Sequence, residues 1–156
     1  MKMIVDSREQ HALRFTVDEI LTEVKVEKLI VGDYQAEYTD GSRPPIIFER
    51  KSLSDCFSTL TGGYKRFKAE LTRAKSANVK LILAIEGSVA DVLGGTDHSK
   101  VEGITILRKL CTLWLKYDLV PVFFESRQSM AKFIYEFYCA FGRLYSKKAT
   151  SGEAHG

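Results

Sequence analysis

The hydrophobic residues of the first fifty positions recur with the period of two that is typical of β-strands. A short apolar run precedes Asp6, and apolar and polar residues alternate from position 24 to 30 until Gly32 interrupts them. Gly32 indicates a bend or bulge, and the Asp-, Gly- and Pro-containing stretch 39–45 predicts a loop. We therefore expect strands over residues 2–5, 24–30, 33–38 and 46–49, with a short helix within 11–21.

The second half of the chain alternates between helical and strand patterns. Apolar residues at spacings of three and four predict helices, whereas short continuous apolar runs predict buried parallel strands. The expected helices cover residues 53–60 (capped by Ser52 or Ser54), 64–77, 88–93, 99–117 (capped by Ser99) and 126–145, and the expected strands cover 80–85 and 119–124. In the helix that ends at Tyr117, the side chains expected to point inward are Ile104, Leu107, Cys111 and Trp114.

This order of elements implies an α/β fold with a mixed central sheet flanked by helices. Asp33 and Glu49 then lie on neighbouring strands of one hairpin. The acidic residues gather at the ends of central strands, where the sites of α/β proteins usually lie. Residues 1–146 are expected to form one domain, and the small, polar segment 147–156 is expected to be a disordered tail.

Composition excludes several classes of protein. The 156 residues suffice for one domain with a real core, and the 45% hydrophobic content is that of a soluble globular protein. The three cysteines are far apart and the three histidines lack metal-ligand spacing, which argues against a disulfide framework and a zinc site. We see no membrane-spanning run and no signal-like segment, so we expect a soluble, intracellular protein of the cytoplasm or nucleoid, or of a eukaryotic nucleus. The net charge of +3 permits a nucleic-acid partner without requiring one.

The candidate chemistry lies around the predicted hairpin. Asp33 follows Gly32, and Glu49 precedes Lys51 by two positions, so Glu49 and Lys51 share one face of an extended segment while Arg50 points away. Two carboxylates can hold a hard divalent cation. A lysine beside it can orient or help to deprotonate a water, and both stabilise charge that develops on a phosphate. Spacing alone favours a solvated Glu–Lys pair, because such pairs recur in any chain with 28% charged residues.

The wider sequence resembles the nuclease domain of the XPF family of structure-specific endonucleases. The similarity rests on Ile4-Val5-Asp6-Ser7-Arg8-Glu9, Gly32-Asp33 and Glu49-Arg50-Lys51-x-x-x-Asp55, which match V-x-D-x-R-E, G-D and E-R-K-x-x-x-D in the family's order. It covers nearly the whole chain, although within 60–67 a glycine replaces the family's usual arginine. The resemblance implies a PD-(D/E)xK fold, a Mg²⁺ cofactor for which Mn²⁺ can substitute, and cleavage of branched or flap-bearing DNA. Many members carry a helicase-like region or a tandem helix-hairpin-helix module, for which this sequence has no room.

The expected metal ligands are Asp33, Glu49 and Asp6, and Lys51 is expected to position or activate the attacking water. Glu9 is expected to add a carboxylate to the metal site or to its surroundings. For Asp6 the alternative is that its side chain caps the turn after the first strand.

Three further residues complete the candidate catalytic set. Arg8 is expected either to pair with the carboxylates or to hold a phosphate. Arg50 is expected to be an ion-pair partner, for example of Asp55, and its backbone carbonyl is also available to a metal. Asp55, on the following helix, is expected to organise the site rather than to bind the metal.

Basic residues gather around the helix expected at 64–77. The candidates for DNA binding are Lys65, Arg66, Lys68 and Arg73, with Lys75 and Lys80 nearby. A duplex backbone requires cations beside the site, and the alternative is an ordinary solvated helix face.

The last expected helix has an apolar stripe wider than one face of a sheet requires. Its members are Met130, Phe133, Ile134, Phe137, Tyr138, Phe141, Leu144 and Tyr145. We expect most of them to be core and part of the stripe to pack on a second copy, and the resemblance also implies a homodimer.

We therefore expect a magnesium-dependent DNA endonuclease that acts on branched DNA or on junctions of single and double strands, with a separate partner available to target it. Two alternatives stay open. One is a non-catalytic DNA-binding module of the same fold, against which the intact Asp, Glu and Lys argue. The other is a restriction- or repair-type nuclease with another substrate preference.

Overall fold

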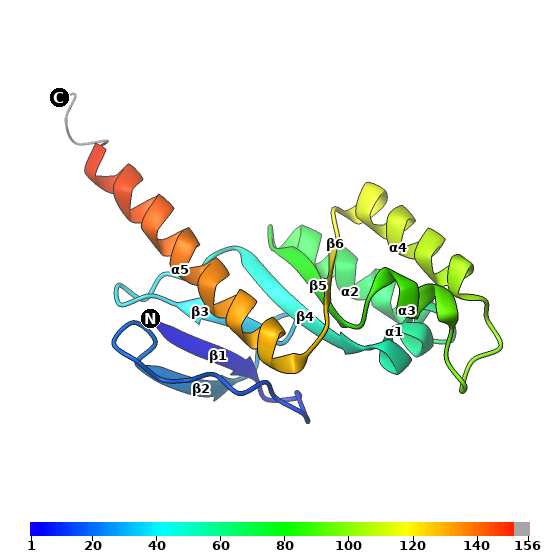
Figure 1. Ribbon diagram of the computed structural model, residues 1–156. Coiled ribbons are helices and arrows are strands. Elements are labelled where there is room, and N and C mark those ends of the chain that lie inside the picture. Colours follow the sequence, from blue (N-terminus) through cyan, green and yellow to red (C-terminus); the bar gives the residue numbers. More distant parts are fainter. Residues whose placement is uncertain (152–156) are drawn as a thin grey trace.

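Six strands form one mixed sheet in the order β2-β1-β3-β4-β5-β6 (Figure 1). The computed structural model describes the backbone of residues 1–151 and the side chains of residues 1–145. The strands are β1 (Lys2–Asp6), β2 (Glu23–Glu27), β3 (Tyr34–Glu37), β4 (Ile46–Ser52), β5 (Lys80–Glu86) and β6 (Val120–Phe124). Strand β3 is antiparallel to β1 and to β4, whereas the other neighbouring pairs are parallel. The predicted mixed sheet is confirmed.

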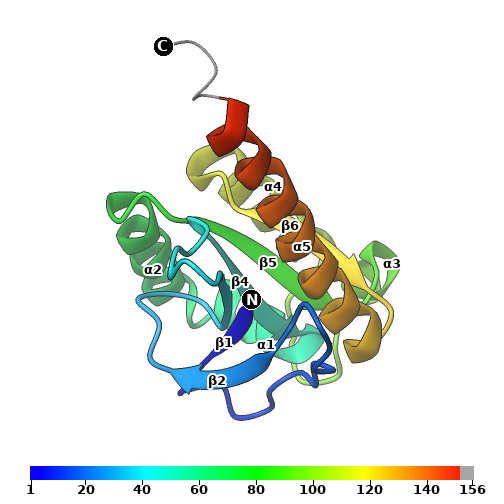
Figure 2. The same cartoon turned by 90° about the vertical axis from the view of Figure 1, so that its left-hand side faces the viewer.

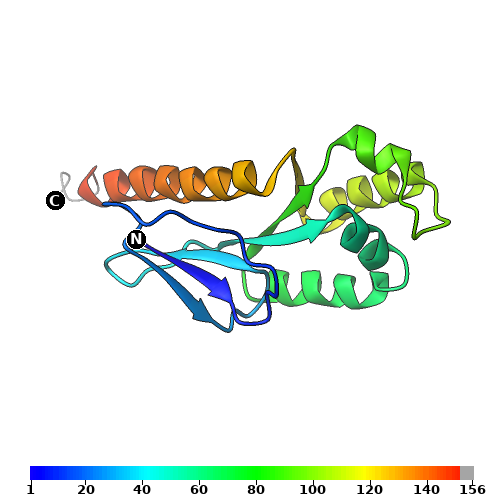
Figure 3. The same ribbon diagram turned by 60° about the horizontal axis from the view of Figure 1, so that its bottom comes forward.

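Helices cover both faces of this sheet (Figures 2 and 3). They are α1 (Leu53–Leu60), α2 (Tyr64–Ser76), α3 (Val89–Gly94), α4 (Gly103–Tyr117) and α5 (Arg127–Ser151). Helix α5 lies on one face, and α1, α2 and α4 lie on the other. The C-terminal end of α5 extends beyond the sheet. None of the helices in the described part of the chain is long and apolar enough to cross a membrane.

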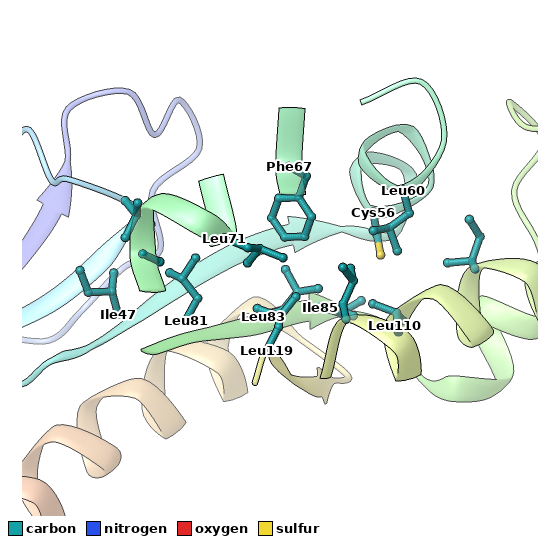
Figure 4. Packing of buried hydrophobic residues seen from close by; sticks show 14 of the residues in the cluster. Ile47, Cys56, Leu60, Phe67, Leu71, Leu81, Leu83, Ile85, Leu110 and Leu119 are labelled. Atoms are coloured by element: carbon teal, nitrogen blue, oxygen red, sulfur yellow. The ribbon is translucent and has the colours of Figure 1, made fainter. Parts of the chain in front are cut away.

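Strand β5 shows how the alternation of side chains divides the core into two layers. Leu81, Leu83 and Ile85 pack against α1, α2 and α4 (Figure 4), whereas Ile82 and Ala84 face α5. Because β5 is central and parallel to both neighbours, all five side chains are buried. Each buried Leu or Ile contributes roughly 1.5–3 kcal/mol to folding. The core thus holds the strand ends that carry the candidate site.

The helix expected within residues 11–21 is wrong. The segment is irregular, because side chains bind the N–H groups that a helix would use. The N–H of Leu13 donates to Tyr34 Oη (2.9 Å), and Asp18 Oδ1 accepts from the N–H groups of Ile20 (2.8 Å) and Leu21 (2.7 Å). The buried side chains of Leu13 and Leu21 attach the segment to the core.

Strand β2 is shorter than the alternating pattern predicts, and its first four residues are exposed while Glu27 is half-buried. Strand β2 lies at the edge of the sheet. Its apolar residues Val24 and Val26 are exposed like their polar neighbours, so the alternation in the sequence does not mark a buried face here. The chain then leaves the sheet, because the N–H of Leu29 donates to Asp6 Oδ1 (3.1 Å). The predicted bend at Gly32 is confirmed by its φ of +72°.

Helix α4 begins at Gly103 rather than at a Ser99 cap, and its buried face is not the predicted one. The buried residues are Gly103, Ile106, Leu110 and Leu113, whereas Ile104, Cys111 and Trp114 are exposed and Leu107 is half-buried. A Cβ atom on Gly103 would lie 2.0 Å from the carbonyl oxygen of Val92 in α3. This close approach sets the rotation of α4, and it depends on a tertiary contact that helical spacing does not contain.

The start of α1 and the end of α5 test the predicted helix boundaries. The Ser52 cap of α1 is confirmed, because Ser52 Oγ accepts the N–H of Asp55 (3.1 Å). Helix α5 continues to Ser151, beyond the predicted end at Tyr145 and into the segment expected to be a tail. Residues 152–156 of that predicted tail lie outside the described residues.

Candidate active site

Strand β4 separates the predicted site residues onto two faces of the sheet. Glu49 shares a face with Ile47, on the side of α1 and α2, and Lys51 follows it there. Lys51 Nζ lies 3.2 Å from Glu49 Oε1. Arg50 shares the opposite face with Phe48, as the alternation predicts.

Asp33 is held beside β4 by its own backbone and by its side chain. Its N–H donates to the carbonyl of Phe48 (2.8 Å), and its Oδ2 accepts the backbone N–H of Arg50 (2.7 Å). The preceding Gly32 has no room for a side chain, since a Cβ would lie 2.5 Å from Ile47 Cγ2. The predicted hairpin therefore brings Asp33 and Glu49 to the same end of the sheet.

These carboxylates open onto a cleft of about 260 Å³ between the strand ends and α2. The lining includes five of the predicted catalytic residues, Asp6, Arg8, Asp33, Glu49 and Lys51, and two of the predicted DNA-binding residues, Arg66 and Arg73. Glu9, Arg50 and Asp55 are not part of the lining.

The surroundings disfavour the charged forms of both carboxylates, of which Glu49 is buried and Asp33 is half-buried. Burial raises the pKa of Asp33 to about 7, with a further contribution from the charge of Glu9. Burial also raises the pKa of Glu49 to about 8, and the charges of Asp33 and Glu70 add to it. A cation between such groups would stabilise their charged forms.

Asp33 and Glu49 fit a divalent cation that retains most of its waters, as Mg²⁺ does. Lys51 and the backbone of Arg50 occupy only one oxygen of each carboxylate. Within the described residues, no group of three or more Asp, Glu, His or Cys side chains is placed to hold a metal. The donor set therefore suits an ion held by two carboxylates and water, rather than one enclosed by protein ligands.

Both carboxylate oxygens of Asp6 already accept hydrogen bonds from protein groups. Its Oδ2 accepts from Arg8 Nε (2.7 Å), and its Oδ1 accepts from Arg8 Nη2 (3.0 Å) and from the N–H of Leu29 (3.1 Å). Burial acts against the charged form, but these hydrogen bonds outweigh it and lower the pKa of Asp6. The geometry favours the alternative role, in which Asp6 fixes the turn after β1 and holds Arg8 at the rim of the cleft.

Arg50 binds Glu9 and Glu86 rather than Asp55, so its predicted partner is wrong. Its Nε and Nη2 lie 3.0 Å from the two carboxylate oxygens of Glu9, and its Nη1 lies 2.8 Å from Glu86 Oε1. Asp55 is exposed in the first turn of α1, where a negative charge is favoured by the helix dipole. Glu86 comes 36 residues after Arg50, and the sequence pattern does not reveal their proximity.

Helix α2 presents two arginines and one carboxylate to the cleft. Arg66, Glu70 and Arg73 line it, at the helical spacings of four and three. Lys68 instead lies 4.6 Å from the ring centre of Tyr64, and Lys65 is exposed outside the cleft. Glu70 is a charged lining residue that is not among the predicted site residues, although its position between the two arginines is the signal that could have identified it.

Comparison with known proteins gives one family and one fold. Residues 5–137 match the ERCC4 domain. A solved structure of XPF from Aeropyrum pernix is similar, with 18% identity, a TM-score of 0.65, and coverage of 97% of this chain and 68% of that one. A structure of XPF from the same organism in complex with DNA has 19% identity, a TM-score of 0.64, and coverage of 94% and 66%. This chain thus spans about two thirds of those chains. A search of the curated proteins gave no match.

Proposed function

Because this chain belongs to the ERCC4 domain family and has the fold of XPF nuclease structures, we propose that it is a magnesium-dependent DNA endonuclease. The observation that carries the proposal is the cleft in which Asp33, Glu49 and Lys51 face the arginines of α2. Such a site combines metal-binding oxygens, a lysine for the reacting water, and cations for the phosphates of the substrate.

Each residue of the cleft has a distinct part in phosphodiester hydrolysis. Asp33 and Glu49 would hold Mg²⁺, or Mn²⁺ in its place, which supplies Lewis acidity and lowers the pKa of a bound water. Lys51 orients the attacking water and stabilises charge that develops on the phosphate. Arg66 and Arg73 hold the DNA backbone beside the scissile bond.

We propose branched DNA, or a junction of single and double strands, as the substrate. XPF from Aeropyrum pernix, whose fold is similar, has been solved in complex with DNA. The cleft offers cations that contact phosphates, which fix position but carry no sequence information. Structure in the DNA, or a separate targeting partner, is then the source of selectivity.

We also propose that the protein is a homodimer through α5. Met130, Ile134 and Tyr138 are fully buried on the sheet side of this helix, whereas Phe133 is 42% exposed and Leu144 is 65% exposed. An apolar surface of this kind marks an interface, and a two-fold arrangement would bury the same helix of each copy.

A cleavage assay on a panel of labelled DNAs tests the function. The panel contains a 5′ flap, a 3′ flap, a fork, a nicked duplex and a linear duplex, each with Mg²⁺, with Ca²⁺ or with EDTA. We expect cleavage of the branched substrates with Mg²⁺ only. Binding without cleavage would favour the non-catalytic module, and equal cleavage of the linear duplex would favour a restriction-type nuclease.

A further inference from the structure

Four charged side chains are linked by hydrogen bonds on the face of the sheet opposite the cleft. They are Glu9, Arg50, Glu86 and Arg127. Arg50 binds both oxygens of Glu9 and reaches Glu86 Oε1 at 2.8 Å. The same Oε1 atom accepts a second hydrogen bond of 2.8 Å, from Nη1 of Arg127 at the start of α5. One carboxylate oxygen therefore connects two guanidinium groups from different elements.

Arg127 also holds the segment that follows Glu9. Its Nη2 donates to the carbonyl oxygens of His11 (2.5 Å) and Ala12 (3.2 Å). Glu9 in turn accepts the N–H of His11 at 3.1 Å. The segment is thus held by Arg50 at one end and by Arg127 at the other.

Arg50 connects this chain of charges to the cleft. Its side chain is 7% exposed and lies on the face of α5, while its backbone N–H donates to Asp33 Oδ2 at 2.7 Å on the other side. Arg50 therefore joins the charged side chains on the α5 face to the Asp33 carboxylate in the cleft. With so little solvent contact, water cannot readily replace a partner that Arg50 loses.

We propose that Arg127 is a positioning residue for the cleft, acting through Glu86 on Arg50 and thereby on the carboxylate of Asp33. The inference rests on the proposed function for its catalytic consequence, but not for the contact itself. Without Arg127, Glu86 loses a partner that holds its shared oxygen, and Arg50 loses a fixed point. A group that orients a metal ligand in this way typically affects metal affinity or activity by about tenfold to a hundredfold.

A matched ion-pair cluster elsewhere in the sheet provides the control. Arg43 contacts Glu37 through Nε (2.9 Å) and Glu27 through Nη1 (2.9 Å), so it too links two carboxylates, but it does not line the cleft. Arg43→Gln and Arg127→Gln each remove one arginine that bridges two elements. A purely structural role for Arg127 predicts the same kind of defect in both variants.

The experiment compares the two variants with the wild-type chain by two independent measurements. Hydrogen exchange of the Arg50 amide, without metal or DNA, reports the bond to Asp33. Steady-state cleavage at several Mg²⁺ concentrations reports kcat, the KM for DNA and the Mg²⁺ midpoint. We expect Arg127→Gln to accelerate exchange of that amide and to lower kcat or raise the Mg²⁺ midpoint about tenfold or more, with little change in KM. Arg43→Gln should change neither.

Glu86→Gln and the double variant Glu86→Gln/Arg127→Gln test the route. If Arg127 acts through Glu86, the double variant should be no worse than the more impaired single variant, because effects along one path are not additive. Glu86→Gln retains an acceptor and nearly the same volume, so it also provides the test should Arg127→Gln not fold.

The measurements distinguish failure of the positioning role from failure of the proposed function. Equal behaviour of Arg127→Gln and Arg43→Gln in both measurements, or full additivity with Glu86→Gln, overturns the positioning role. A wild-type chain that cuts no DNA, combined with faster Arg50 exchange in Arg127→Gln, overturns the proposed function and supports the positioning contact.

Discussion

Lys51 Nζ lies 3.2 Å from Oε1 of Glu49, two residues earlier on the same strand and facing the same cleft. If Lys51 orients the water or stabilises developing charge, Lys51→Ala should lower kcat by about a hundredfold or more, as the loss of a transition-state contact does. Mg²⁺ affinity, measured by calorimetry, should change little. Lys2→Ala, which breaks an ion pair with Glu23 at the sheet edge, is the control. A Lys51 variant with only weaker metal binding would contradict this role.

Loss of either metal-binding carboxylate should abolish cleavage and spare DNA binding. Asp33→Ala and Glu49→Ala each remove one of the two proposed ligands, and the rate should fall at least about a thousandfold. DNA affinity, measured by fluorescence anisotropy in Ca²⁺, should stay within a few-fold of the wild type. Asp40→Asn in the exposed loop is the control. Near-normal cleavage by Asp33→Ala in Mg²⁺ would refute the site.

The raised pKa values of Asp33 and Glu49 predict how stability depends on pH. The pKa values are about 7 and about 8 in the folded protein, against ordinary values of 3.8 and 4.5. Between about pH 4 and pH 8, the folded state therefore binds more protons than the unfolded state. The stability that these two groups contribute is fully present below about pH 4 and is lost as the pH rises through 7 to 8.

Asp33→Asn removes the free-energy cost of ionising residue 33 in the folded protein, and the amide oxygen still accepts the Arg50 N–H. In metal-free buffer, we expect its Tm to exceed that of the wild type by an amount that grows from pH 4 to pH 8, reaching about 3–6 °C, or ~1–2 kcal/mol. Thermal unfolding followed by circular dichroism provides the measurement. A Tm difference that does not vary with pH would show that Asp33 ionises normally.

The basic side chains of α2 should bind phosphates without reading sequence. Charge reversal of Lys65, Arg66 and Arg73 to Glu should weaken binding equally for unrelated DNA sequences. The slope of log K against log salt should fall by about one for each lost phosphate contact. Reversal of Lys2, Lys100 and Lys116, which lie outside α2, is the control. An unchanged slope after reversal on α2 would place the DNA elsewhere.

The dimer through α5 can be tested by mass. Light scattering at micromolar concentration should give about twice 17.6 kDa. Phe133→Glu/Leu144→Glu should give a monomer, whereas Val26→Glu at the 68% exposed edge position should leave the dimer intact. A wild-type monomer with full nuclease activity would refute the proposal.

The sequence reveals the parts of the site that depend on local periodicity. The alternation along β4 correctly separates Glu49 and Lys51 from Arg50, and Gly32 correctly indicates the bend before Asp33. It does not reveal contacts that depend on how distant elements pack. The ion-pair partners of Arg50 and the choice of which face of α4 is buried both depend on such packing. The hydrophobic periodicity of the sequence does not contain this information.

A helix prediction can also fail when backbone donors have competing acceptors. The segment 11–21 has a mixed pattern, and the hydroxyl of Tyr34 and the carboxylate of Asp18 bind the N–H groups that a helix needs. Asp18 is close in sequence and hints at this outcome, but Tyr34 comes 21 residues after Leu13. Only the packed structure shows that donor and acceptor meet.

The alternation along β4 also determines where the gene can accept changes in length. Losing one codon between Ile46 and Lys51 would move the remaining side chains to the opposite face of the sheet, so the arginine would enter the cleft and the glutamate would meet α5. The same loss within the exposed part of loop 39–45 changes only the distance that the chain spans between β3 and β4. Natural variation in length should therefore be found in that loop and be absent from the strand beside it.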